Sequence, residues 1–499
     1  MPSYEQAEPD IQFYAKLEKR KIATDTIGQL AENEKSNIFT DKENIMNIPT
    51  KFYTKLYTPE TTSTKKQEKL LRNIKQKITE EQKELLDALI TIEEIKIAIF
   101  QMQSGKSPGL DGIPVEFYQE YWEEIKDLYM AFINKVKEEA FPTGKNTGVI
   151  KLIYKKTGEI FLLKNYRPIS LINVDIKILT KTLANRLKYI LPTIIHMSQT
   201  AVYGRKIEQT IHMIRDLIDL SNKGEEQAAF IFLDQEKAFD RVDHTFLYKT
   251  MRAFGIGEHF ISWISKIYSN ASAVLNINGF LSKRIPLNRG VRQGCPLSTL
   301  LYVLVIEVFA LQLRFNPNIV GFTIGGEKIV SAHYLDDATI IITQNRCFKE
   351  VIKEINEYEE ASGAKVNCDK TKGLWTGSWK NRRVPPIDMK WTSKNVKNLG
   401  VYFGNDDPAS ETFDEIIPTF KKLLNYWKQF KLTNMGKARV VEIFLASKLI
   451  YAIKFYSIPN NIQEQLQKDI FQFVNFPDSE TVAQKEMWKT KKKWGNKTY

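Results

Sequence analysis

The order of apolar and polar positions predicts a chain of mixed strands and helices. Ala228–Leu233 is an unbroken apolar run of the kind found in buried strands, and it ends in the carboxylate Asp234. Apolar runs on both sides of Tyr334–Asp337 predict two strands joined by a tight turn that carries Asp336 and Asp337 at its tip. Val396–Phe403, which contains Gly400, predicts a further short hairpin.

Helical spacing of apolar residues predicts most of the remaining elements. The polar, Lys- and Glu-rich residues 1–90 predict a helical lead-in whose periodicity breaks near Pro49 and Pro59. The Gly- and Pro-rich stretch Ser104–Pro114 predicts a loop. Residues 115–225 are mostly helical in pattern. Further helices are expected at Ile176–Ile190, Leu300–Leu311 and 350–361, and again from about residue 413 onward, where the pattern is basic.

Composition narrows the class of protein. The 499 residues exceed one ordinary domain and predict two to four packed units, and 43% hydrophobic residues can bury a substantial core. Lys and Arg number 72 against 59 Asp and Glu, and the net charge of +13 favours a polyanionic partner, most simply nucleic acid. The three cysteines show no Cys-x-x-Cys spacing and the five histidines are scattered. This argues against a disulfide framework and a zinc knuckle.

No segment indicates secretion or a membrane partner. Met1–Asp10 is polar and acidic, unlike a secretory signal. The most apolar run, Leu300–Leu311, is interrupted by Glu307 and predicts a buried core helix too short to span a bilayer. We therefore expect a soluble intracellular protein, in a cytoplasmic ribonucleoprotein, the nucleus or both. The sequence does not fix the oligomeric state.

Carboxylates at the ends of neighbouring strands suggest metal chemistry. Asp234, Asp336 and Asp337 could hold two Mg²⁺ ions, which activate a 3′-hydroxyl and stabilise a leaving pyrophosphate in nucleotide transfer. An Asp-Asp pair alone is more often simple turn chemistry. The hypothesis therefore depends on the motifs around the carboxylates.

Six segments of the chain form a recognisable series: Gly105–Gly112, Asn165–Leu171, Asp234–Val242, Arg289–Ser298, Tyr334–Asp337 and Ser362–Thr371. They occur in the order of the motifs of a reverse transcriptase. Together they resemble the polymerase of LINE-type (non-LTR) retrotransposons, from about residue 95 to 475. Each segment alone has an ordinary explanation, but all six would have to arise by chance in the correct order.

The resemblance implies an α+β right-hand polymerase with fingers, a palm built on an antiparallel sheet, and a helical thumb. The lead-in would cover 1–90, the fingers 91–227, and the palm 228–410, with interleaved helices and a primer-grip hairpin. The thumb would cover 411–476 and a basic tail 477–499. The implied activity is RNA-directed DNA polymerisation from dNTPs, with an RNA template and a DNA primer as partners.

The resemblance also assigns roles to residues. Asp234, Asp336 and Asp337 would be catalytic and would bind two Mg²⁺ ions, with Mn²⁺ able to replace them. Lys155 and Arg167 would meet the triphosphate, because the planar guanidinium can bind two phosphate oxygens. Phe239 would lie beneath the sugar, where its ring rejects a 2′-hydroxyl, and Gln293 would lie at the nascent base pair. Lys370 would donate a proton to pyrophosphate. The implied contacts with nucleic acid are Gly290, Gly294, Leu399 and Gly400, and those with phosphates are Lys421, Lys422 and Lys491–Lys493.

Simpler explanations stay open for several of these residues. Arg167 could form a surface ion pair, Phe239 could be a core aromatic, and Lys370 could be solvated. Asp240 is expected to hold local backbone structure. Cys295 is expected to be a small packed residue, since no His partner is suggested nearby for a nucleophile.

Departures from the family pattern leave a rival function open. The third fingers motif, Gln199–Arg205, is shortened and altered, Leu335 replaces a usual Ala, and Thr299 replaces a usual Pro. A catalytically inactive, retroelement-derived nucleic-acid-binding remnant is therefore the alternative. A group II intron-type enzyme would need a further splicing domain, and Phe239 disfavours an RNA-dependent RNA polymerase. The lead-in is too short for the endonuclease that the family often carries, so we expect no DNA cleavage.

Overall fold

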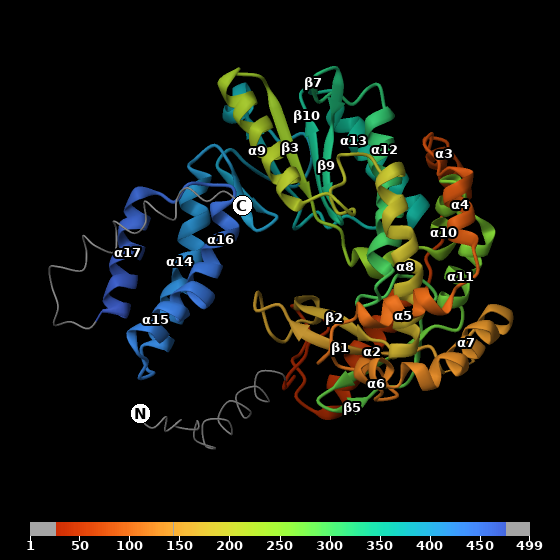
Figure 1. Ribbon diagram of the computed structural model, residues 1–499. Coiled ribbons are helices and arrows are strands. Elements are labelled where there is room, and N and C mark those ends of the chain that lie inside the picture. The colour runs from red at the N-terminus through yellow and green to blue at the C-terminus, as the bar shows by residue number, and fades with distance from the viewer. Residues whose placement is uncertain (1–25, 143, 476–499) are drawn as a thin grey trace. The chain divides into compact units, whose positions relative to one another are not determined.

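The computed structural model describes residues 26–142 and 144–475 (Figure 1). These residues fall into two units. Unit 1 comprises described residues up to 206 together with 233–338 and 345–370. Unit 2 comprises 207–232, 339–344 and the residues from 371 onward. The chain division between the two units falls within β3 (Ala228–Leu233) and within β10 (Asp337–Ile342). The last residue of β3 and the first two residues of β10 belong to unit 1. The described parts mix helices and sheets, as the α+β prediction requires.

Unit 1 contains most of the helices and one mixed sheet. Its strands lie in the order β2-β1-β4-β5, with β6 pairing β4; β1 runs antiparallel to β2 and parallel to β4. The sequence pattern of residues 115–225 did not predict β1 and β2. The elements are α2 (Lys42–Tyr57), α3 (Thr64–Leu71), α4 (Glu80–Asp87), α5 (Ile92–Phe100), α6 (Val115–Glu120), α7 (Trp122–Glu139), β1 (Thr147–Tyr154), η1 (Leu163–Asn165), β2 (Tyr166–Leu171), α8 (Val174–Ile194), η2 (Ala238–Arg241), α10 (His244–Ala253), α11 (Glu258–Tyr268), β4 (Ser272–Ile277), β5 (Phe280–Leu281), β6 (Ile285–Pro286), α12 (Ser298–Phe315), β7 (Phe322–Ile324), β8 (Glu327–Ile329), β9 (Ser331–Tyr334) and α13 (Cys347–Ser362).

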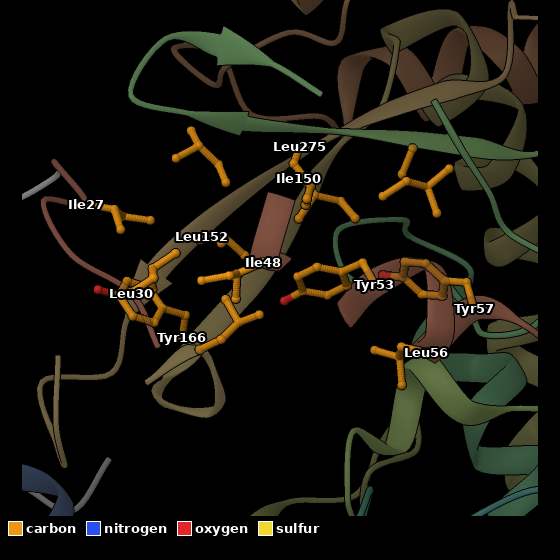
Figure 2. Packing of buried hydrophobic residues seen from close by; sticks show 14 of the residues in the cluster. Ile27, Leu30, Ile48, Tyr53, Leu56, Tyr57, Ile150, Leu152, Tyr166 and Leu275 are labelled. Carbon is orange, nitrogen blue, oxygen red and sulfur yellow. The ribbon is translucent and has the colours of Figure 1, made fainter. Parts of the chain in front are cut away.

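Helix α2 of the lead-in is part of the core of unit 1. Ile48, Tyr53 and Tyr57 pack in one buried cluster with residues of β1 and β4, such as Ile150 and Leu275 (Figure 2). The lead-in therefore supports the first sheet, which its polar composition did not suggest. The irregular path of Ser104–Pro114 agrees with the predicted loop.

The predicted helix break near Pro49 is wrong. Helix α2 continues through Pro49 and ends at Tyr57, two residues before Pro59. A proline inside a helix costs about 3 kcal/mol because its nitrogen cannot donate a hydrogen bond. Burial of Ile45, Ile48 and Leu56 on the same helix contributes roughly 1.5–3 kcal/mol for each side chain and outweighs that cost.

Helix α12 is the predicted core helix, but it is longer than the apolar run indicated. Its 18 residues are mostly buried within unit 1, and Glu307 is fully buried. Among the described residues it is the one helix whose length and composition would allow a membrane span; core helices of soluble proteins share these properties. The helices predicted at Ile176–Ile190 and 350–361 are present as α8 and α13.

Unit 2 combines part of a second sheet with a helical bundle. Its strands lie in the order β12-β11-β3-β10. Strand β11 is antiparallel to β3 but parallel to β12, so the predicted antiparallel sheet contains one parallel pair. The predicted hairpin is confirmed as β13–β14, and the helices from residue 413 onward are confirmed with a start at Pro408. The elements are α9 (Ile207–Lys223), β11 (Lys372–Thr376), η3 (Gly377–Asn381), β12 (Lys390–Thr392), β13 (Asn395–Asn398), β14 (Val401–Gly404), α14 (Pro408–Trp427), α15 (Asn434–Val440), the π-helical η4 (Val441–Ala446), α16 (Ser447–Ile453) and α17 (Asn460–Val474).

Candidate active site

Two strands bring the three predicted carboxylates to one place in unit 1. Asp234 directly follows β3, Asp336 lies in the turn after β9, and Asp337 is the first residue of β10. Strands β3 and β10 are neighbours in the sheet. The predicted strand Ala228–Leu233 and the strand–turn–strand arrangement around Asp336 are both confirmed.

The turn that carries Asp336 has an unusual backbone. Leu335 adopts φ 55°, a left-handed conformation that costs a residue with a side chain roughly 1–2 kcal/mol. The Leu335 amide donates to Oε1 of Gln199 at 3.1 Å, and the Thr200 amide donates to the His333 carbonyl at 3.0 Å. The altered third fingers motif therefore still holds the turn through Gln199. Sequence reasoning missed this role, although Gln199 is a position at which the altered motif still matches the family.

The carboxylates share an excess of negative charge. Loss of hydration raises the pKa of Asp234, Asp336 and Asp337. For Asp337 the repulsion from Asp336 and Asp234 adds to this effect, and the pKa reaches about 7. The nearby Lys370 and Lys155 act in the opposite direction on Asp234. A bound cation would reduce the repulsion among the three carboxylates.

The donor chemistry at this position fits a hard divalent ion. Among residues 26–142 and 144–475, no three His, Cys, Asp or Glu side chains are grouped closely enough to form a ready metal cage. Mg²⁺ is usually held by one or two carboxylates together with substrate phosphates and water, rather than by an all-protein cage. Asp234, Asp336 and Asp337 therefore fit a metal that is completed by a nucleotide.

Positive side chains gather beside the carboxylates. Burial, together with the charges of Lys237, Lys370 and Arg167, lowers the pKa of Lys155 to about 8, whereas Asp234 opposes the shift. The pKa of Lys237 is also lowered, chiefly by burial. Cations crowded in this way are suited to bind an anion with several charges, such as a polyphosphate. Lys155, Arg167 and Lys370 were predicted; Lys237 was missed, although it lies within the segment that begins at Asp234.

Phe239 is held in a fixed orientation. Its ring stacks on the ring of Tyr302 in α12, with centroids 4.6 Å apart and planes 17° from parallel. The Tyr302 hydroxyl donates to Oε1 of Gln235 at 3.1 Å. Tyr302 is buried, whereas Phe239 is only half-buried. Its proposed contact with the sugar remains a prediction.

Gln293 contacts a buried carboxylate. Its Nε2 donates to Oδ2 of Asp240 at 3.2 Å, and the Tyr57 hydroxyl donates to Oδ1 at 3.2 Å. Burial raises the pKa of Asp240 to about 6, with Lys237 and these two donors holding it down. Asp240 thus has a structural role, but its carboxylate contacts the side chains of Tyr57 and Gln293 instead of the local backbone expected from the sequence. Cys295 is buried, as expected for a packed residue.

The two glycines near Gln293 approach the chain's own backbone. Gly290 has φ 91°, and a Cβ added there would lie 2.7 Å from the Asp240 carbonyl oxygen. Gly294 has φ 113°, and its Cβ would lie 2.6 Å from the Ser170 carbonyl oxygen. Packing between motifs already requires glycine at both positions, whether or not a ligand lies nearby. Their contact with nucleic acid stays a prediction.

The predicted primer-grip residues belong to unit 2. Leu399 and Gly400 form the tip of the β13–β14 hairpin with φ 47° and 80°. The Tyr451 hydroxyl of α16 donates to the Leu399 carbonyl at 2.6 Å, and its ring lies where a Cβ on Gly400 would crowd it. Within unit 2 the hairpin is thereby tied to the helices. Lys421 and Lys422 are exposed on α14, while Lys491–Lys493 lie outside the described residues.

Comparisons with known proteins agree with the motif order. A family model described as reverse transcriptase (RNA-dependent DNA polymerase) matches residues 153–403, just over half of the chain. The Xenopus laevis protein named "Transposon TX1 uncharacterized 149 kDa protein" is 35% identical over 93% of this chain and 36% of its own length. The Pol polyprotein of the Popillia japonica type-1 element R2 is 26% identical over 74% of this chain and 52% of that protein.

A third relative carries the activity in its name. The "RNA-directed DNA polymerase from mobile element jockey" of Drosophila melanogaster is 24% identical over 74% of this chain and 42% of that protein. The chain spans between about a third and about half of the length of these relatives. The matched family region contains the three carboxylates and the four neighbouring cations Lys155, Arg167, Lys237 and Lys370. This chain belongs to the reverse transcriptase family, among the enzymes of LINE-type (non-LTR) retrotransposons.

Proposed function

We propose that this chain is an RNA-directed DNA polymerase that adds dNTPs to the 3′-hydroxyl of a primer paired with an RNA template. One observation carries the proposal: three mutually repelling carboxylates lie beside a cluster of Lys and Arg side chains in unit 1. A nucleotide triphosphate with divalent metal supplies the opposite charge to both groups. The family membership supports the same reaction.

The residues divide the work of phosphoryl transfer. Two Mg²⁺ ions, when bound, would lower the pKa of the primer hydroxyl and neutralise charge on the leaving pyrophosphate. Asp234, Asp336 and Asp337 would hold these ions. Lys155 and Arg167 would orient the triphosphate. With a pKa of about 8, Lys155 is still mostly cationic at pH 7. Lys370 would donate a proton to the departing pyrophosphate.

The architecture is proposed from the same resemblance. Residues 91–227 would form the fingers, 228–410 the palm and 411–476 the thumb. The packing of α2 within the core of unit 1 indicates that the lead-in supports this assembly. The inactive-remnant alternative is not favoured, because Asp234, Asp336 and Asp337 are all present at the positions that the motifs predict.

Removal of divalent metal should stop the reaction. Purified protein is expected to extend a DNA primer on an RNA template with Mg²⁺ or Mn²⁺. EDTA should abolish the product, because without metal the anionic carboxylates would repel the triphosphate and nothing would neutralise the developing charge. Added Mg²⁺ in excess of the chelator should restore it. Extension that persists after complete chelation would refute the metal-dependent mechanism, and no extension under any metal would refute the proposed activity.

Salt should reveal the phosphate contacts of α14. If the exposed Lys421 and Lys422 bind phosphates, changing both to Ala should reduce the slope of log affinity against log salt by about two units. The matched control changes Lys75 and Lys77, which are also exposed, to Ala. Binding of a fluorescent RNA–DNA primer–template over a salt series measures both slopes. Equal slopes in the wild type and the Lys421/Lys422 variant would mean that these lysines are merely solvated.

A further inference from the structure

We propose that Tyr57 and Glu60, which precede all the polymerase motifs, are positioning residues for nucleotide selection. They act on Phe239 and Gln293 through Asp240 and two buried arginines. The inference rests on the proposed function, because it assigns Phe239 and Gln293 to the incoming nucleotide. Neither Tyr57 nor Glu60 touches the reacting atoms in this scheme.

The Tyr57 side chain is held in place by its packing. It is buried at the end of α2, and its ring stacks on that of Tyr53 with centroids 5.8 Å apart (Figure 2). Its hydroxyl donates to one oxygen of Asp240 while Gln293 donates to the other. Burial holds the pKa of Tyr57 well above its usual value, so the hydroxyl stays protonated as a donor. One carboxylate therefore links the lead-in to Gln293.

Glu60 joins three polymerase motifs. Its two oxygens accept from one terminal nitrogen of Arg241 at 2.8 and 2.9 Å, and one of them also accepts from Arg289 at 3.3 Å. The Nζ of Lys365 lies 3.6 Å from Oε2 of Glu60. These three cations come from the segments Asp234–Val242, Arg289–Ser298 and Ser362–Thr371.

The two guanidinium groups depend on this carboxylate. The side chains of Arg241 and Arg289 are only 6% and 2% exposed, whereas that of Glu60 is 42% exposed. Arg241 also donates to the Gly363 carbonyl at 3.1 Å, and Arg289 donates to the Leu56 carbonyl at 2.6 Å. Removing the partner of a buried charge costs far more than removing a surface pair. Loss of the Glu60 charge should therefore shift both arginines.

A shift of the arginines would reach the nucleotide contacts directly. Phe239 lies in the same short helix, η2, as Asp240 and Arg241. The Val291 amide donates to the Phe239 carbonyl at 2.7 Å, and the Gly290 amide donates to the Val242 carbonyl at 2.8 Å. These bonds join the segment that carries Phe239, residues 239–242, to the segment that carries Gln293, residues 290–293. The orientation of both side chains thus depends on one clamp, formed by Tyr57 and Glu60 with Asp240, Arg241 and Arg289.

Two conservative variants test the inference. Tyr57→Phe removes only the hydroxyl, and Glu60→Gln removes only the charge. Each should raise KM for dNTPs by about 3- to 30-fold and reduce the preference for dNTPs over rNTPs, with a smaller change in kcat. Glu32→Gln is the matched control, since it breaks the exposed Lys51–Glu32 pair on the same segment and should change neither quantity.

A second measurement separates positioning from general stability and from the polymerase assignment. Hydrogen exchange of the Gly290 and Val291 amides should become faster in both variants, whether or not the protein extends primers. Unchanged exchange would overturn the clamp itself. Faster exchange and a lower melting temperature, with KM and sugar preference as in the wild type, would overturn the role in nucleotide selection. A wild type without primer extension would overturn that role and the proposed function, while the exchange result would still decide the clamp.

Discussion

Asp336→Ala is expected to abolish primer extension while RNA–primer binding stays nearly unchanged. The carboxylate would hold metal rather than template, so its loss removes several kcal/mol of charge stabilisation from the transition state only. The rate should fall by about a thousandfold or more. Asp234→Ala should have the same effect. Single-turnover extension and equilibrium binding of the same primer–template measure the two quantities.

A charge-matched control makes the result specific. Asp388→Ala removes an exposed carboxylate of unit 2 that has no proposed role, and it should extend primers like the wild type. If Asp336→Ala also removes binding, the residue holds the fold or the template instead. Robust synthesis by the Asp336→Ala protein would sink the metal assignment.

Phe239→Val is expected to admit ribonucleotides. The ring would lie under C2′ of the incoming nucleotide, where a 2′-hydroxyl collides with it, so the effect should follow side-chain volume. We expect discrimination between dNTPs and rNTPs to fall by about 10- to 1000-fold, equivalent to about 1.4–4 kcal/mol of differential transition-state stabilisation. Phe239→Ala should have the same effect. Parallel incorporation assays with dNTPs and rNTPs measure the ratio.

The stacking of Phe239 on Tyr302 offers a competing explanation, namely core packing. Phe246→Val provides the comparison, because Phe246 is fully buried in α10 of the same unit. That control should lower the melting temperature without changing sugar preference. If Phe239→Val behaves like the control and still rejects rNTPs as the wild type does, the ring has no gating role.

Local patterns predicted the elements that carry the carboxylates. The run Ala228–Leu233 and the hairpin around Leu399 contain their own signals, namely continuous apolar residues in the first and a turn glycine in the second. Strands β1 and β2 were missed because short apolar runs with an interspersed Lys or Arg fit helices and strands equally well. The helix through Pro49 was missed because its buried face outweighs local propensity.

The candidate site likewise contains residues that could be predicted from the sequence and residues that could not. Asp234, Asp336 and Asp337 could be predicted because Asp234 directly follows a recognisable strand, Asp336 lies in the turn between two strands, and Asp337 begins the second of them. The network of Tyr57, Glu60 and Asp240 could not, since its partners are about 180 or more residues apart in sequence and no local pattern records which ones meet. The reason for the positive φ of Gly290 likewise became visible only when its neighbour Asp240 was known.

The shared core of α2, β1 and β4 has a consequence for how the protein is made. Ile48 and Tyr53 pack in one cluster with Leu275 and Leu287, so helix α2 cannot bury its apolar face fully until strands far along the chain exist. At typical synthesis rates the ribosome needs about 10–50 s to add those residues. During that interval the exposed apolar face of α2 would be open to chaperones and to aggregation. Expression at low temperature or with added chaperone should therefore raise the soluble yield more than mutations that stabilise the finished fold.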